Sequence, residues 1–150
     1  MLVDKDEMIL RTKALALSVI KLTESLPRTQ TAHIIGRQVL RSATSVGANY
    51  RAACQARSRA DFIAKLGIVA EEADETQYWM ELLIDSGTCR SQAVGALMQE
   101  AKEITSIVVA SLKTARKAKP VPARASSASV GRDGQIADPK SQIPNSEATQ

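Results

Sequence analysis

The chain has 150 residues, a formal net charge of +4 and 44% hydrophobic residues, with only one Phe, two Tyr and one Trp. This length suffices for one domain with a single core. The N-terminus carries acidic residues where a signal peptide needs basic ones, and no apolar run approaches the roughly 18 residues of a membrane span. We therefore expect a cytoplasmic protein with no membrane-spanning segment.

Apolar residues recur at helical spacing over four stretches, 6–25, 30–56, 61–86 and 90–117, and no stretch alternates as a strand does. Short connectors between helices of similar length favour antiparallel neighbours. The sequence therefore predicts an all-α protein, an antiparallel up-down-up-down four-helix bundle over residues 1–118. The residues predicted to face inward are Met8, Leu15, Val19, Leu22 and Leu26; Ile35, Val39, Ala43, Val46, Tyr50 and Ala53; Phe62, Leu66, Val69, Ala73, Met80 and Leu83; and Leu97, Ala101, Ile104, Val108 and Leu112.

Turn and capping residues separate the four stretches. Pro27 disfavours helical geometry at the residue before it, and Thr29 or Thr31 can cap the second helix. Ser58, with an acid three residues on, is a start signal for the third helix, and Gly87 suits the position just after its end. From residue 119 to residue 150 the composition changes to Pro, Ser, Ala and Gly without periodicity, which predicts a disordered tail.

Two glycines lie inside the second predicted helix, Gly36 and Gly47. Each costs about 1 kcal/mol relative to alanine in a helix interior. This cost is understandable if another helix packs closely at both points, so we expect close helix contacts there.

Charge is segregated along the chain. Between residues 28 and 60 there are six arginines and one histidine but no acid, whereas residues 61–85 carry seven carboxylates against one lysine. At about 100° per residue, Arg37, Arg41 and Arg51 fall on one face of the second helix. Arg57 and Arg59 follow at its end. This pattern predicts a basic surface for a polyanion or an acidic partner.

The same arginines have a structural interpretation. Because the acidic stretch follows so closely, they can instead pair with Glu71, Asp74 or Glu75 of the third helix, within a subunit or across an interface. Aromatic residues that would stack on bases are scarce. Any nucleic-acid binding is therefore expected to involve the backbone and to be largely independent of base sequence.

The sequence contains no recognisable motif for catalysis or metal binding. Cys54 and Cys89 form no CxxC pair, so free buried thiols are expected, with a disulfide between them as the alternative. The single histidine, His33, is interpreted as a surface residue. The acids of the third helix lack the Glu-x-x-His repeats of carboxylate-bridged metal bundles. No phosphate loop or Ser/His/Asp set is present. We therefore expect a protein that has no enzymatic activity and binds no metal, cofactor or small-molecule substrate.

Three apolar residues of the third helix, Tyr78, Trp79 and Leu82, fall outside its main apolar stripe and lie among acids. A lone bundle would leave part of this surface in contact with water. Either the bundle covers it or another subunit does, and exposed apolar area of this kind favours a subunit interface.

Three segments carry a resemblance to a known family. Residues 38–50 read QVLRSATSVGANY, residues 57–63 read RSRADFI, and residues 70–76 read AEEADET. Together they resemble the four-helix-bundle family of 23S rRNA-intervening sequence proteins, some of which are encoded inside large-subunit ribosomal RNA genes. The most characteristic part is the run of Arg41, Ser45, Val46 and Asn49. From their spacing alone, Ser45 and Asn49 are interpreted as a structural pair one turn apart, with partner binding as the alternative.

The resemblance implies a left-handed antiparallel bundle that assembles as a ring-shaped homopentamer. The family also includes the accessory proteins of diversity-generating retroelements. The resemblance therefore implies nucleic acid or a reverse transcriptase as possible partners. Many relatives read Ile-Ala-Glu-Gly where this chain has Tyr50-Arg51-Ala52-Ala53, so the second helix is more basic here and loses a carboxylate.

Two hypotheses for function follow. The first is a non-enzymatic oligomeric scaffold that binds the RNA or DNA backbone through the arginines of the second helix. The alternative is a protein-interaction module whose basic face docks an acidic partner, with no nucleic-acid role.

Overall fold

The computed structural model describes residues 4–118, so the predicted disordered tail at 119–150 lies outside the described residues. Four helices form the described part: α1 (Lys5–Ser25), α2 (Gln30–Cys54), α3 (Arg59–Asp85) and α4 (Ser91–Lys117). Every predicted helix end is correct to within two residues.

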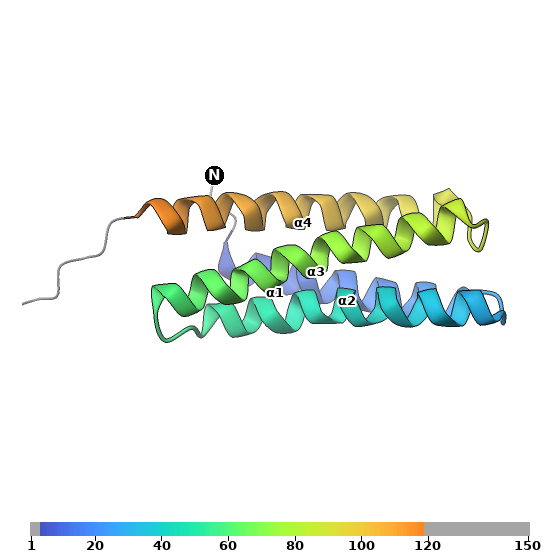
Figure 1. Cartoon of the computed structure of the whole chain (residues 1–150), viewed down its shortest axis with the longest axis horizontal. Helices are drawn as coiled ribbons and strands as arrows, with labels where there is room; N and C mark the ends of the chain where they lie inside the picture. Colours follow the sequence, from blue (N-terminus) through green and yellow to red (C-terminus); the bar gives the residue numbers. More distant parts are fainter. Residues whose placement is uncertain (1–3, 119–150) are drawn as a thin grey trace, which may run out of the picture. The chain divides into compact units, whose positions relative to one another are not determined.

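The helices form the predicted antiparallel bundle. The α1–α2 and α3–α4 connectors lie at one end and the α2–α3 connector at the other (Figure 1). Each helix packs against two neighbours: α1 and α3 each contact both α2 and α4. Among the described residues, α1 and α3 do not contact each other, and neither do α2 and α4. The four helices therefore occupy the corners of a square.

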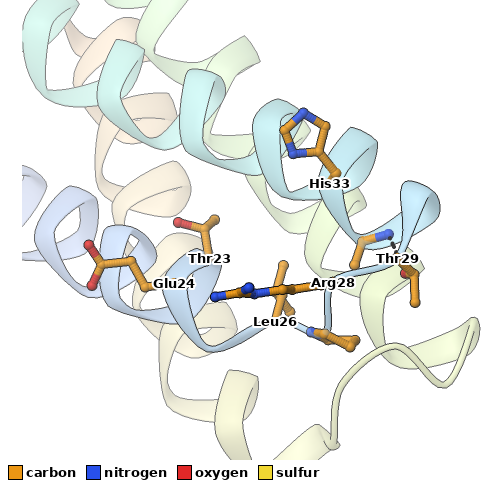
Figure 2. Close-up of a pocket in the computed structure, with 8 residues that line it drawn as sticks. Thr23, Glu24, Leu26, Arg28, Thr29 and His33 are labelled. Atoms are coloured by element: carbon orange, nitrogen blue, oxygen red, sulfur yellow. Dashed lines mark hydrogen bonds between the residues drawn. The ribbon is translucent and has the colours of Figure 1, made fainter.

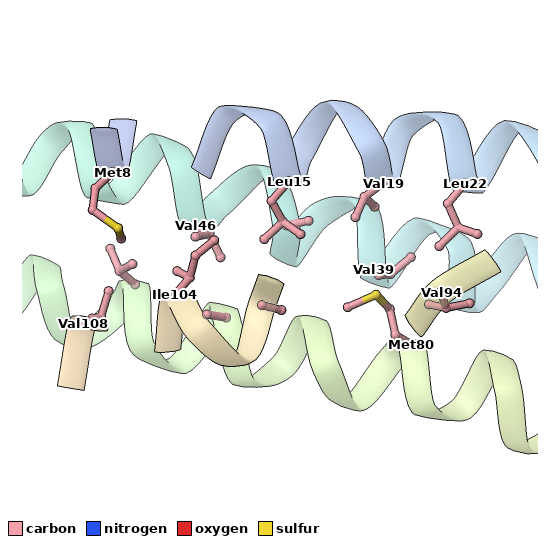
Figure 3. Packing of buried hydrophobic residues seen from close by; sticks show 14 of the residues in the cluster. Met8, Leu15, Val19, Leu22, Val39, Val46, Met80, Val94, Ile104 and Val108 are labelled. Carbon is pink, nitrogen blue, oxygen red and sulfur yellow. The ribbon is translucent and has the colours of Figure 1, made fainter. Parts of the chain in front are cut away.

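The core fills the space between the four helices (Figure 3). The predicted inward residues are all buried or half-buried against it, and Leu26, Ile35, Tyr50, Phe62 and Leu97 are the half-buried ones. Val94, which the sequence analysis did not include, is fully buried. The 3.6-residue periodicity of the sequence therefore identified the packing faces correctly.

Local signals in the sequence place the helix ends. The Thr29 side chain accepts a hydrogen bond from the Ala32 N–H at 3.1 Å, and Ser58 accepts one from the Asp61 N–H at 3.1 Å. Gly87 has a φ of +70°, the left-handed geometry that favours glycine after a helix end. These three predictions are confirmed, with Thr29 rather than Thr31 as the cap.

Both glycines of α2 lie where another segment approaches closely. A Cβ on Gly47 would sit 3.5 Å from the Thr12 carbonyl oxygen of α1, and one on Gly36 would sit 3.1 Å from Leu26 Cδ1. The expected helix contact is therefore present at Gly47, at an ordinary van der Waals distance, whereas the tightest neighbour of Gly36 is the side chain of the connector residue Leu26.

Polar links join neighbouring helices. In the core, Thr76 Oγ1 donates to Ser42 Oγ at 2.9 Å between α3 and α2. Another bond runs from Gln77 Nε2 to Thr105 Oγ1 at 3.0 Å between α3 and α4. Over residues 4–118 no buried side-chain nitrogen or oxygen lacks a partner. These hydrogen bonds offset the desolvation cost of the buried polar groups.

The α1–α4 side is closed by ion pairs. Arg11 contacts Glu100 through Nε and Oε1 at 2.8 Å, and it contacts Glu103 through Nη2 and Oε2 at 2.8 Å. The Glu100 carboxylate raises the pKa of Arg11.

None of the helices between residues 4 and 118 combines the length and the apolar character that crossing a membrane requires.

Candidate nucleic-acid interface

The outer face of α2 carries the arginines predicted to bind a polyanion. Val39, Ala43 and Val46 are fully buried on the inner face, and helical geometry therefore turns Arg37 and Arg51 outward, where both are exposed. Within residues 4–118 neither guanidinium lies within ion-pair distance of a carboxylate. These two side chains are available to an anionic ligand.

Arg41 is paired instead with α3. Its Nη1 lies 3.3 Å from Glu72 Oε1, and its Nη2 contacts Glu75 Oε1. Glu75 Oε1 also accepts a hydrogen bond from Trp79 Nε1 at 2.9 Å. The bonds from Arg41 and Trp79 lower the pKa of the Glu75 carboxyl. For Arg41 the structural interpretation therefore holds, with Glu72 and Glu75 as partners.

The remaining acids of the predicted pairing lie elsewhere on α3. Glu71 and Asp74 are exposed, and among the described residues neither forms an ion pair. Helical geometry explains the difference, because Glu72 and Glu75 lie three residues apart on the side of α3 that faces α2.

Arg57 and Arg59 lie at the α2–α3 connector and act locally. The Arg57 backbone N–H donates to Asp61 Oδ2 at 3.2 Å, and Arg59 Nε donates to the Ala115 carbonyl at 2.6 Å. That carbonyl belongs to the last turn of α4, whose carbonyls lack helical partners. Arg59 therefore ties the start of α3 to the end of α4, whereas the Arg57 side chain is exposed.

Two further basic residues extend the exposed face toward the other end of α2. Arg28 in the α1–α2 connector and His33 in the first turns of α2 are both exposed (Figure 2). They border an open hollow that also includes Thr23 and Glu24. The surface position expected for His33 is confirmed. Arg28 was not singled out from the sequence, because a connector residue has no place in a helical periodicity.

Ser45 and Asn49 form a local pair on α2. Asn49 Nδ2 lies 2.9 Å from the Ser45 carbonyl oxygen and 2.9 Å from Ser45 Oγ. Both side chains are half-buried. The structural pair expected from the spacing of Ser45 and Asn49 is therefore present.

The aromatic pair of α3 is covered only in part. Tyr78 is 52% exposed, whereas Trp79 is half-buried and packs against the core. Their rings meet edge to face with centroids 5.1 Å apart, and Leu82 is half-buried. The bundle therefore covers most of Trp79 and leaves Tyr78 open. A subunit contact through these residues stays a prediction.

Reactive groups are not gathered into a site in the part of the chain that the structure describes. Cys54 and Cys89 are free and half-buried, and burial raises the pKa of the Cys89 thiol. No group of three or more His, Cys, Asp or Glu side chains suited to a metal ion occurs between residues 4 and 118. What the described surface offers is exposed positive charge on a rigid helical scaffold.

An antiparallel four-helix bundle with a basic second helix is the class that the fold and this surface define. The family model of the 23S rRNA-intervening sequence protein matches residues 5–110, and the chain belongs to this family. A crystal structure of a protein of unknown function from the S23 ribosomal protein family of Bacteroides thetaiotaomicron is similar, with 37% sequence identity and a TM-score of 0.66. The similarity covers 73% of this chain and 97% of that one. No curated protein matches this chain.

Proposed function

We propose that this protein is a non-enzymatic, oligomeric scaffold that binds the phosphate backbone of nucleic acid through the outer face of α2. The observation that carries the proposal is the pair of exposed guanidinium groups, Arg37 and Arg51, in a segment of 33 residues, 28–60, that contains no carboxylate. Guanidinium groups bind phosphate oxygens in a bidentate manner, which makes such a face a natural phosphate contact.

Oligomerisation strengthens this function. A single copy offers few phosphate contacts, and few contacts give weak binding at physiological salt. Several copies on one strand or duplex would multiply the contacts and raise the overall affinity through effective concentration. The family description refers to 23S rRNA, so RNA is the first ligand to test.

A second candidate, docking of an acidic protein, is favoured by one observation. Arg41 already binds two carboxylates, those of Glu72 and Glu75, so this face accommodates carboxylates. An acidic segment of a partner protein could occupy Arg37 and Arg51 in the same way.

Fluorescence anisotropy of the purified full chain tests the proposal. Labelled single-stranded RNA and duplex DNA of mixed sequence would be titrated at increasing salt. We expect binding at low salt. The logarithm of the binding constant should fall linearly with the logarithm of the salt concentration, with a slope of about 0.7 per phosphate contact for single strands and about 0.9 per contact for duplex DNA. Absence of binding to both at low salt would refute the nucleic-acid function. Tight binding of polyglutamate in place of RNA would support the acidic-partner alternative.

A further inference from the structure

A hollow lies at the end of the bundle where α2 ends and α3 begins. Its volume is about 510 Å³, and residues of α1, α2, the α2–α3 connector and α3 line it. This volume falls within the range of small-molecule sites, about 300–1,000 Å³. Neither Arg37 nor Arg51 lines the hollow. It is therefore a candidate ligand site separate from the two guanidinium groups of the proposed function.

Two of the four aromatic residues of the chain line this hollow. Tyr50 lies on α2 and Phe62 on α3, and both are half-buried against the core. Ala53 and the free thiol of Cys54 add to the apolar part of the lining. Aromatic side chains bind nucleobases by stacking, whatever the base, because every base has a π-face. Aromatic residues are scarce in the chain as a whole, but the fold gathers two of them here.

Two cations and a hydroxyl line the same hollow. Lys5 and Arg59 are both exposed, and among the described residues neither forms an ion pair. The bond from Arg59 Nε to the Ala115 carbonyl uses one of the five guanidinium N–H groups. Ser58 Oγ accepts a bond from the Asp61 N–H and keeps its own hydrogen to donate. Groups of this kind bind phosphate oxygens.

One acid reduces the positive charge at this place. Asp4 precedes α1 and is exposed. Together with burial and the Cys54 side chain, its charge raises the pKa of Tyr50. The Asp4 side chain makes no capping hydrogen bond to α1, so the helix does not depend on this carboxylate as a cap. Its removal is therefore a clean way to change the charge beside the hollow.

We propose that this hollow binds a nucleoside monophosphate, with the base against Tyr50 and Phe62 and the phosphate between Lys5 and Arg59. The combination of groups decides the class of ligand. A bare phosphate would leave the aromatic side chains uncovered, and an uncharged ring would leave both cations without a partner. The nucleotide is either free or the end of an RNA strand, and in the second case the inference rests on the proposed function.

Calorimetric titration of the full chain at low salt tests the inference. The three probes are adenosine monophosphate, adenosine and inorganic phosphate. Tyr50→Leu removes the aromatic ring, and Tyr50→Phe, which keeps it, is the matched control. Lys5→Gln removes one cation of the hollow, and Lys13→Gln, at another exposed position of α1, is the control for net charge. Circular dichroism would first confirm that each variant is folded.

We expect adenosine monophosphate to bind more tightly than adenosine or phosphate. Tyr50→Leu should weaken its binding roughly ten-fold, within the range for the loss of one base–aromatic stack, and Tyr50→Phe should change it little. Lys5→Gln should weaken its binding several-fold and leave adenosine unaffected. Asp4→Asn should tighten it. No binding of adenosine monophosphate at millimolar concentration, or equal losses in Lys5→Gln and Lys13→Gln, would overturn the inference. If Tyr50→Leu does not fold, the lysine pair decides.

Fluorescence anisotropy with a short RNA, with and without a terminal phosphate, distinguishes the two sources of nucleotide. Tighter binding of the phosphorylated strand, lost in Lys5→Gln, would assign the hollow to strand ends. Equal binding of both strands, with adenosine monophosphate still bound, would assign it to free nucleotides. Nucleotide binding without RNA binding would support the hollow and refute the proposed function. RNA binding without nucleotide binding would overturn the inference and leave the proposed function standing.

Discussion

At the scale of single residues, the arginines on the outer face of α2 differ in their partners. Arg41 shares the outer region of α2 with Arg37 and Arg51, yet its guanidinium is held by Glu72 and Glu75. Exposed ion pairs of this kind contribute little to stability, because solvent screens the two charges. Under the proposed function, a ligand phosphate would compete with these carboxylates for Arg41.

The first prediction concerns this competition. The double substitution Glu72→Gln and Glu75→Gln should tighten RNA binding and steepen its salt dependence by about one phosphate contact, because Arg41 is released. Glutamine keeps an acceptor oxygen for the Trp79 N–H. The control removes two exposed carboxylates away from this face, through Glu7→Gln and Glu81→Gln. An equal gain in the control variant would show that net charge rather than Arg41 is responsible.

The second prediction concerns Tyr50 at high pH. Burial, together with the Cys54 side chain, raises the pKa of Tyr50 to about 12, above the ordinary value of about 10. The folded state therefore holds this proton more tightly than the unfolded state. The stability that Tyr50 contributes is fully present below about pH 10 and is lost as pH rises toward 12.

Denaturant unfolding near pH 9 and near pH 11, with Tyr50→Phe as the comparison, measures this effect. The difference in free energy of unfolding between the two pH values should be smaller for Tyr50→Phe, since phenylalanine cannot ionise. An identical alkaline loss in both proteins would contradict the assignment to Tyr50.

Some residue-level features could be predicted from the sequence and others could not. The Ser45–Asn49 pair was predictable because both partners lie on one helix, four residues apart. The Ser42–Thr76 bond and the Arg11–Glu100 pair were not, since they depend on the register between helices, which periodicity does not specify. For the arginines the sequence supplied both possibilities, and only the structure separates Arg41 from Arg37 and Arg51.

At the scale of helices, capping residues and close contacts set the geometry. Thr29, Ser58 and Gly87 determine where helices begin and end, and each was recognisable because its chemistry is local. Gly47 allows α1 to approach α2, with the Thr12 carbonyl as the nearest group. How closely α1 packs on α2 at this point therefore depends on the size of the side chain at position 47.

The third prediction is a size series at Gly47. Gly47→Ala should be tolerated and can stabilise by up to about 1 kcal/mol, because an added Cβ would make ordinary contact at 3.5 Å and alanine favours the helix. Gly47→Leu should destabilise by roughly 1–3 kcal/mol through overpacking against α1. Gly95→Ala, with open space around its added Cβ, is the control for helix propensity alone. Thermal unfolding gives the comparison, and a stable Gly47→Leu variant would show that α1 does not pack closely there.

At the scale of the whole molecule, the sequence predicts the four-helix bundle and the segment of residues 119–150 on different grounds. The fold class and all four helices followed from the sequence because helix periodicity and connector lengths leave few alternatives for this chain.

The fourth prediction is that residues 119–150 are dispensable for folding. Their composition offers too little apolar surface to offset the entropy of ordering. Truncation after Ala118 should leave the melting temperature and the assembly mass nearly unchanged. A large fall in melting temperature would show instead that this segment packs on the bundle.

The central claim, that the outer face of α2 is a phosphate-binding surface, is tested most directly by comparing two variants of equal net charge. Arg37→Gln with Arg51→Gln removes the two α2 guanidiniums that form no ion pair among the described residues, whereas Lys102→Gln with Lys113→Gln removes two exposed amines of α4. Glutamine has nearly the helix propensity of either residue, so both bundles should remain folded. RNA affinity across a salt series should fall several-fold with a flatter slope for the arginine variant and change little for the lysine variant. Equal losses in the two variants would contradict the claim.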